Sequence, residues 1–225
     1  MGQGLLQMSR GRGAVLAGAV VLLVAGCSAT SDGVASSTPQ DSAASQSVSS
    51  PPSESQSLSG GQLPHSGAPA VSDPLPESVL AIDPCEVLTR DQVEEMLGDD
   101  APEGQRNDLK TGPSCDWQDP KSGAGFSVYL GTETRQGLSG YYQNTKPQAG
   151  IWREVPEFHG FPAVVSSADE SPYTSCHMAV GLADEYTISV GVTLSRDRMG
   201  KGDKCEPVQK LAEMLVENLK ERAGR

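Results

Sequence analysis

The sequence predicts a single α+β domain with an antiparallel sheet, one helix near each end of the domain, and two disulfides. Three observations lead to this prediction. A capping-box signature opens a short amphipathic segment near residue 90. Two neighbouring segments between residues 176 and 194 alternate between apolar and small or polar residues, which is typical of strands. An apolar stripe with helical spacing ends the chain, so the helices are expected to flank strands that are mostly adjacent in sequence.

The first helix is expected over residues 90–97. The Thr89 hydroxyl can accept a hydrogen bond from the Gln92 backbone amide while the Gln92 side chain reaches back to Thr89. Gly98 provides the left-handed residue that ends such a helix.

The middle of the domain is expected to be mostly strands. Residues 99–112 are polar and turn-rich, and no strand is expected there. A helix is expected within residues 137–148, around Tyr141 and Tyr142, and it should end at Pro147. The expected strands are residues 126–130, 151–155, 161–166, 176–182 and 186–194. Residues 183–185 form a suitable hairpin loop between the last two strands.

The C-terminal helix begins around Pro207, a residue that fits the first turn of a helix. Lys220 and Arg222 near its end suit the negative end of the helix dipole. Its buried stripe should consist of Val208, Leu211, Leu215, Val216 and Leu219.

Four of the five cysteines lie in the domain and predict two disulfides. Cys85, Cys115, Cys176 and Cys205 allow three pairings, of which we favour the sequential one, Cys85–Cys115 and Cys176–Cys205. Each bridge would close a loop of about 30 residues and stabilise the fold by roughly 3–4 kcal/mol. The alternative use of four cysteines is a zinc site, but no Cys-x-x-Cys spacing is present, and no metal or cofactor is expected.

The fifth cysteine, Cys27, ends an apolar segment that resembles a bacterial lipobox, Val24-Ala25-Gly26-Cys27. Arg10 and Arg12 precede this segment, which is shorter than the ~20 residues of a membrane-spanning helix. We therefore expect residues 1–26 to be a lipoprotein signal peptide and Cys27 to carry the lipid that anchors the protein. The resemblance places the protein at the extracytoplasmic face of the cell membrane, which also suits disulfides.

Residues 27–80 are expected to be a disordered tether, because they are rich in Ser, Pro and Gly and contain no aromatic residue, lysine or arginine. Residues 81–225 then form the globular domain. The whole chain has a net charge of −12, which argues against nucleic acid as a partner because such binding needs clustered lysine and arginine.

Two sequence motifs carry a further resemblance. The run Asp83-Pro84-Cys85-Glu86-Val87-Leu88-Thr89 and the later Cys115-Asp116-Trp117 look like the opening of the actinobacterial lipoprotein family of domain of unknown function 3558. Cys176, the hairpin after it, and Cys205 before the last helix are similar to the second half of that family. The resemblance covers residues 81–219 and implies a lipid-anchored, disulfide-bonded, extracytoplasmic domain. It implies no catalytic residues.

Few side chains suggest a catalytic, metal-binding or ligand-binding role. His159 and His177 lack any metal or catalytic motif, and His65 falls in the expected tether. Trp117 and Trp152 are expected to be core aromatics rather than pocket walls. The acidic residues of the 99–108 loop lack the spacing of a calcium loop, so they are expected to be solvated; they are Asp99, Asp100, Glu103 and Asp108.

One sheet face is the strongest candidate for binding, because small residues line the side of the last hairpin opposite the apolar one. They are His177, Ala179, Gly181, Thr187, Ser189, Gly191 and Thr193. This face is expected to be solvated, covered closely by a helix, or used as a platform for a partner. If it is a platform, bulky residues at Gly181 and Gly191 should abolish binding without disturbing the fold.

These observations favour a lipid-anchored, non-enzymatic binding or interaction module. Its partners are expected to be the membrane, through the lipid on Cys27, and an envelope protein or cell-wall component. The alternative is an extracytoplasmic carrier of an apolar or glycan ligand, which requires an internal cavity rather than a packed core.

Overall fold

The structure of the protein, a computed structural model, describes residues 62–173 and 175–225. The expected signal peptide, Cys27 and the first part of the expected tether lie outside the described residues. None of the helices between residues 62 and 225 combines the length and apolar character that crossing a lipid bilayer requires.

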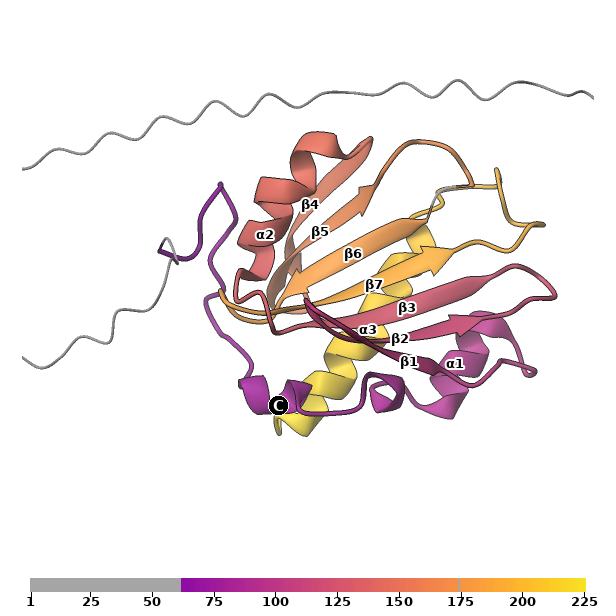
Figure 1. The fold of residues 1–225 in the computed structure, drawn as a ribbon, viewed down its shortest axis with the longest axis horizontal. Helices are drawn as coiled ribbons and strands as arrows, with labels where there is room; N and C mark the ends of the chain where they lie inside the picture. Colours follow the sequence, from indigo (N-terminus) through magenta and orange to yellow (C-terminus); the bar gives the residue numbers. More distant parts are fainter. Residues whose placement is uncertain (1–61, 174) are drawn as a thin grey trace, which may run out of the picture. The chain divides into compact units, whose positions relative to one another are not determined.

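The described chain forms one seven-stranded antiparallel sheet with helices on both faces (Figure 1), so the predicted α+β fold is confirmed. The strands lie in the order β1-β2-β3-β7-β6-β5-β4. They are β1 (Gln105–Leu109), β2 (Gly112–Gln118), β3 (Gly125–Gly131), β4 (Ile151–Phe158), β5 (Phe161–Ser167), β6 (Cys176–Gly181) and β7 (Thr187–Thr193). The helices are α1 (Arg90–Leu97), α2 (Gly137–Asn144) and α3 (Glu206–Arg222), with short 3-10 turns η1 (Glu77–Leu80), η2 (Pro84–Glu86) and η3 (Lys146–Gln148).

The first face of the sheet, which we call the core face, packs against α3. The stripe of α3 meets side chains that alternate along β3, β6 and β7, and the central ones are fully buried: Val128, Met178, Val180, Ile188, Leu211, Leu215 and Leu219. The capping box of α1 forms as predicted, with Gln92 N donating to Thr89 Oγ1 at 3.2 Å. The 3.6-residue spacing gives α3 one apolar side, and the two-residue alternation gives the strands one apolar face. These two apolar surfaces pack against each other and form the core.

Both disulfides join elements across the core. Cys85 in η2 is bonded to Cys115 in β2, and Cys176 in β6 is bonded to Cys205 at the start of α3. The favoured sequential pairing is therefore confirmed. Cys115, Cys176 and Cys205 are almost completely buried, so these bridges lie within the packed core.

Helix α2 lies on the other face of the sheet, which we call the second face. Strand β3 is at the centre of the sheet and the next strand, β4, is at its edge, so the connection must cross β7, β6 and β5. Helix α2 occupies this crossover and packs Leu138 and Tyr142 on Val164 and Ala179. The topology therefore decides which part of the second face is covered.

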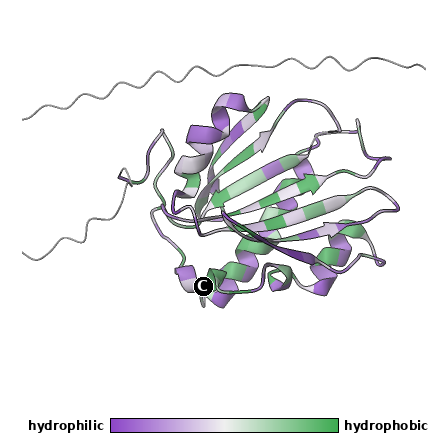
Figure 2. Cartoon of the chain, in the orientation of Figure 1, coloured by the Kyte–Doolittle hydropathy of each residue, from purple (hydrophilic) through white to green (hydrophobic). Residues whose placement is uncertain are grey.

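Two sequence predictions differ from the structure at the N-terminal side. Residues 99–112 were expected to lack a strand, but they contain β1, which pairs with β2 in a hairpin. All five residues of β1 are exposed, and all but Leu109 at its end are hydrophilic (Figure 2), so it has no apolar alternation to reveal it. Such polarity is common in edge strands, where it discourages pairing with other chains.

The folded domain also begins before residue 81. Residues 62–80 pack on the rest of the domain, and Leu75 is only 1% exposed. The Leu75 amide donates to the Leu182 carbonyl at 3.0 Å, and the Tyr186 hydroxyl donates to the Leu75 carbonyl. The folded domain therefore starts before the predicted boundary at residue 81, because a few apolar residues of the Ser/Pro-rich segment pack against it.

Candidate functional site

The second face of the sheet is divided by α2 into a covered and an uncovered part. In the covered part Ala179 and Thr187 are buried, and a Cβ atom on Gly181 would lie 2.9 Å from Leu138 Cδ1 of α2. Bulky residues at Gly181 would therefore disturb the packing of α2. Of the three possibilities considered for this face, close cover by a helix is the one observed at Gly181, and a free platform is excluded there.

The uncovered part, which we call the open face, lies over the centre of the sheet. One cross-strand row contains Asp116 of β2, Ser127 of β3, Gly191 of β7 and His177 of β6, since these residues are register partners. A shallow hollow of about 160 Å³ lies along this row. The small residues of the last hairpin therefore remain accessible only at this end.

His177 closes one side of this hollow. A Cβ atom on Gly191 would lie 2.7 Å from His177 Nδ1, so only glycine lets the imidazole lie this close to β7. This packing removes water from one side of the ring and lowers the pKa of His177. At neutral pH the ring is therefore an uncharged donor and acceptor.

A pH-dependent stability should follow from His177. Its pKa is about 6.5 in the unfolded chain and lower in the fold, so the unfolded state binds more protons in this window. The free energy of unfolding should fall as the pH drops from 7.5 to 5.5, and His177→Gln should lose less stability over this range. Urea unfolding at both pH values measures the difference, and equal losses in the two proteins would contradict the assignment.

A second hollow lies beside α2 on the same face, with a volume of about 330 Å³. Tyr129 of β3 and Tyr141 of α2 contribute aromatic rings to it. Burial raises the pKa of both tyrosines. The hydroxyl of Tyr129 has Thr111 as its hydrogen-bond partner, and that of Tyr141 has Ser189 and Thr187. Both phenols therefore stay protonated over the physiological range.

This second hollow is lined without any charged side chain. Its lining consists of Thr111, Tyr129, Gly131, Thr134, Gln136, Gly137, Gly140, Tyr141, Asn144, Thr145 and Thr187. Tyr129 and Ser127 project from the same face of β3, two residues apart, so the two hollows lie in neighbouring rows of the sheet. We call them together the open groove.

A third cavity, of about 580 Å³, lies between the start of β4 and the loop that precedes α3. It is lined by Trp152, Arg153, Glu170, Asp203 and Lys204 among others. Arg153 forms an ion pair with Asp203 at 2.5 Å, and the pKa of Asp203 is lowered, chiefly by this contact. The positive charges of this cavity are thus already engaged within the protein.

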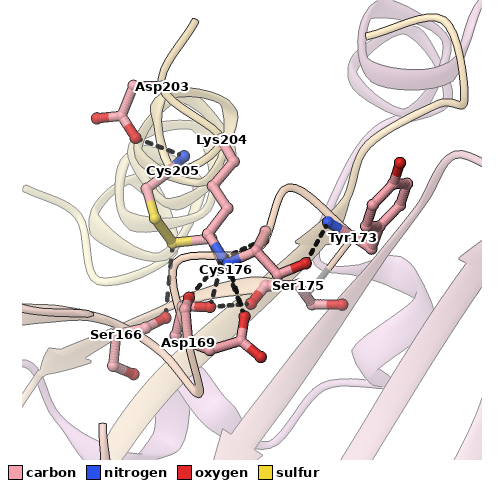
Figure 3. A network of polar contacts seen from close by, with 10 residues as sticks. Ser166, Asp169, Tyr173, Ser175, Cys176, Asp203, Lys204 and Cys205 are labelled. Carbon is pink, nitrogen blue, oxygen red and sulfur yellow. Dashed lines mark hydrogen bonds and ion pairs between the residues drawn. A yellow bond between two sulfur atoms is a disulfide. The ribbon is translucent and has the colours of Figure 1, made fainter. Parts of the chain in front are cut away.

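Lys204 is the central residue of that network (Figure 3). Its side chain is only 8% exposed, and Nζ donates to Ser167 Oγ at 2.9 Å and to the carbonyl oxygens of Asp169 and Ser171 at 2.7 Å each. Three acceptors satisfy the three donors of an ammonium group. Lys204 therefore holds the loop after β5 against the start of α3.

The other sequence candidates are placed as follows. Trp117 is buried and stacks on Phe126 with 4.7 Å between ring centroids, whereas Trp152 is half-buried and packs edge-on against Tyr142. His65 belongs to the folded domain, not to a tether, since its amide donates to Ser139 Oγ at 2.9 Å. His159 lies beside two glutamates of α3.

The acidic loop does not gather into one site, because its carboxylates contact different cations. Glu103 lies 3.6 Å from Arg90, Asp100 lies 3.4 Å from Lys121, and Asp108 lies 2.7 Å from Arg106. The sequence predicted one side of the open groove, because the alternation of the last hairpin placed His177, Gly191 and Thr187 on this face. It did not predict that Tyr141 and Thr111, which come from distant elements, would join them.

The fold and the groove define a class of protein: a two-disulfide α+β domain with an all-antiparallel sheet, whose second face is only partly covered by a helix. The chain belongs to the family of proteins of unknown function DUF3558, whose family model matches residues 22–218. The searches of curated proteins and of solved structures found no match.

The motifs that suggested this family have structural roles. Asp83 caps η2 by accepting a hydrogen bond from the Cys85 amide at 2.8 Å, and Cys85 forms the first disulfide. Cys115 and Trp117 both point into the core. Asp83, Cys85, Cys115 and Trp117 therefore build the disulfide-linked end of the domain, whereas Asp116 lines the open groove.

Proposed function

We propose that the protein is a membrane-anchored module of the cell envelope that binds an uncharged glycan segment in the open groove. The uncharged lining of the hollow beside α2 is the observation that carries this proposal. Hydroxyl and amide groups can donate to and accept from sugar hydroxyls, and the tyrosine rings offer apolar surface for the faces of sugar rings. No reaction at the groove is proposed.

Charge supports an uncharged ligand. Among all the residues that line one hollow or the other, Asp116 is the only one with a charged side chain when His177 is neutral. The whole chain carries a net charge of −12, which disfavours anionic polymers. A neutral glycan meets neither repulsion nor a buried charge that would need a partner.

The packing of the described domain supports a protein that binds its ligand at the surface rather than a carrier that encloses it. The core side chains of α3 and of the central strands are fully buried and in mutual contact. The hollows of the open groove are wide open to the surface and follow the sheet. A carrier would need a cavity that encloses most of its ligand.

The groove can be blocked at Ser127, which lies at its floor. In Ser127→Tyr a ring should fill the hollow between Asp116, Gly191 and His177, and binding should weaken at least tenfold. The fold should be unaffected, because tyrosine is favourable in strands and this position faces solvent. The probe is purified neutral cell-wall polysaccharide, tested by co-sedimentation and then by calorimetry with its soluble fragments.

The control for this experiment is Gln209→Tyr, which adds the same ring at an exposed position of α3 on the core side of the sheet. It should bind as the unmodified protein does. The proposal would be overturned if the unmodified protein did not bind the polysaccharide, or if both variants bound equally well.

The anchor is proposed to be a lipid on Cys27. The lipobox-like run before it supports this, and the family match from residue 22 includes Cys27. Residues 28–61 would then separate the folded domain from the membrane, where the groove meets envelope polymers.

A further inference from the structure

We propose that His159, Glu213 and Glu217 form a binding site for a divalent transition-metal ion such as Zn²⁺. The site lies where the β4–β5 hairpin meets α3, away from the open groove, and the inference does not rest on the proposed glycan binding. It is the one group of metal-ligand side chains of this kind that the described residues bring together.

Two separate elements supply the three side chains: α3 carries both glutamates, and the turn between β4 and β5 carries His159. Glu213 and Glu217 are four residues apart on α3, so they lie on the same side of the helix. His159 and Gly160 form the two-residue turn between β4 and β5, with φ angles of 52° and 94°. Both angles are positive, as in the type I′ turn that suits a tight hairpin.

Neighbouring contacts keep this turn against α3. The Phe158 ring packs against the imidazole of His159 with 4.8 Å between centroids. Lys220 Nζ donates to the His159 carbonyl oxygen at 3.4 Å. The ammonium of Lys220 is thus engaged with the backbone of the turn.

The three side chains approach one another without forming close hydrogen bonds. His159 Nε2 lies 3.6 Å from Glu213 Oε1, and Nδ1 lies 3.9 Å from Glu217 Oε1. Both separations exceed those of good hydrogen bonds. The two contacts involve different ring nitrogens, of which one would bind the ion. With one ligand atom taken from each residue, the three atoms lie within 4.8 Å of one another. Ligand atoms bound to one Zn²⁺ at about 2.0–2.1 Å lie roughly 3.4 Å apart, so the side chains would move closer to complete the site.

The ligand types indicate the class of metal. An imidazole nitrogen with two carboxylates suits Zn²⁺, Mn²⁺, Co²⁺ or Ni²⁺, whereas Ca²⁺ prefers oxygen ligands alone. One ring nitrogen binds the ion, and water fills the positions that the protein leaves open. The ion would cross-link the β4–β5 hairpin to α3 and offset the repulsion between Glu213 and Glu217.

The test uses residues 27–225 with Cys27→Ser, so that no free thiol competes for metal and both disulfides stay intact. Zn²⁺ should raise the melting temperature, and calorimetry should give a stoichiometry of one. Co²⁺ should give a visible absorption spectrum that Zn²⁺ abolishes. His159→Gln and Glu213→Gln should each weaken Zn²⁺ binding at least tenfold.

Glu206→Gln provides the matched control, because Glu206 is an exposed glutamate at the other end of the same helix, well away from the cluster. It should bind Zn²⁺ as the unmodified protein does. Retained binding in His159→Gln and Glu213→Gln would show that the ion binds elsewhere. That result, or the absence of any Zn²⁺-induced change, would overturn the proposal.

Discussion

Replacing Cys176 and Cys205 by alanine should lower the free energy of unfolding by about 3–4 kcal/mol from the lost cross-link alone. The bridge spans 29 residues and joins the central strand β6 to the start of α3. Without it the unfolded chain gains conformational freedom, and α3 loses its covalent link to the sheet. Because both cysteines are buried in the core, lost packing should add to this value.

The Cys85–Cys115 pair provides the comparison. Its separation of 30 residues predicts the same loop contribution, but Cys85 is only partly buried. Cys85→Ala with Cys115→Ala should therefore destabilise the protein less than the other double variant. Urea unfolding of both variants measures the difference; a loss below about 1 kcal/mol in either one would contradict the loop estimate.

Replacing Cys27 by serine should move essentially all of the protein from the membrane fraction to the soluble fraction. Each buried methylene of an acyl chain contributes about 0.8 kcal/mol to membrane binding, and two chains or more are needed for stable anchoring. Serine at this position cannot form the thioether.

Fractionation of cells that express each variant, with metabolic palmitate labelling, tests this prediction. Cys85→Ser with Cys115→Ser provides the control, because it removes a disulfide but leaves Cys27 in place. The control should stay labelled and in the membrane fraction. Palmitate label in Cys27→Ser would exclude Cys27 as the lipid-bearing residue.

The elements that the sequence predicted well are those with strong local signals. Helix α1 has a capping box, α3 has a complete apolar stripe, and β6 and β7 alternate cleanly. Strand β1 was missed because all its residues face solvent, so no alternation marks it. Leu75 was missed because one apolar residue among Ser and Pro does not show what it packs against.

The candidate site was harder to predict, because it depends on topology. The sequence pattern placed His177, Ala179 and Gly191 on one face, but not the helix that crosses part of it. That crossing follows from the position of β4 at the sheet edge, which only the strand order reveals. His159 and Glu213 likewise lie far apart in sequence, so their proximity follows from the docking of α3.

The buried ammonium of Lys204 has a consequence for how the loop after β5 keeps its shape. Carbonyl and hydroxyl oxygens converging on one positive centre are the ligands that a bound Ca²⁺ ion would take. Here the positive centre is covalently part of the chain. The loop therefore needs no ion from its surroundings, and chelators or changes in calcium concentration should leave its conformation unchanged.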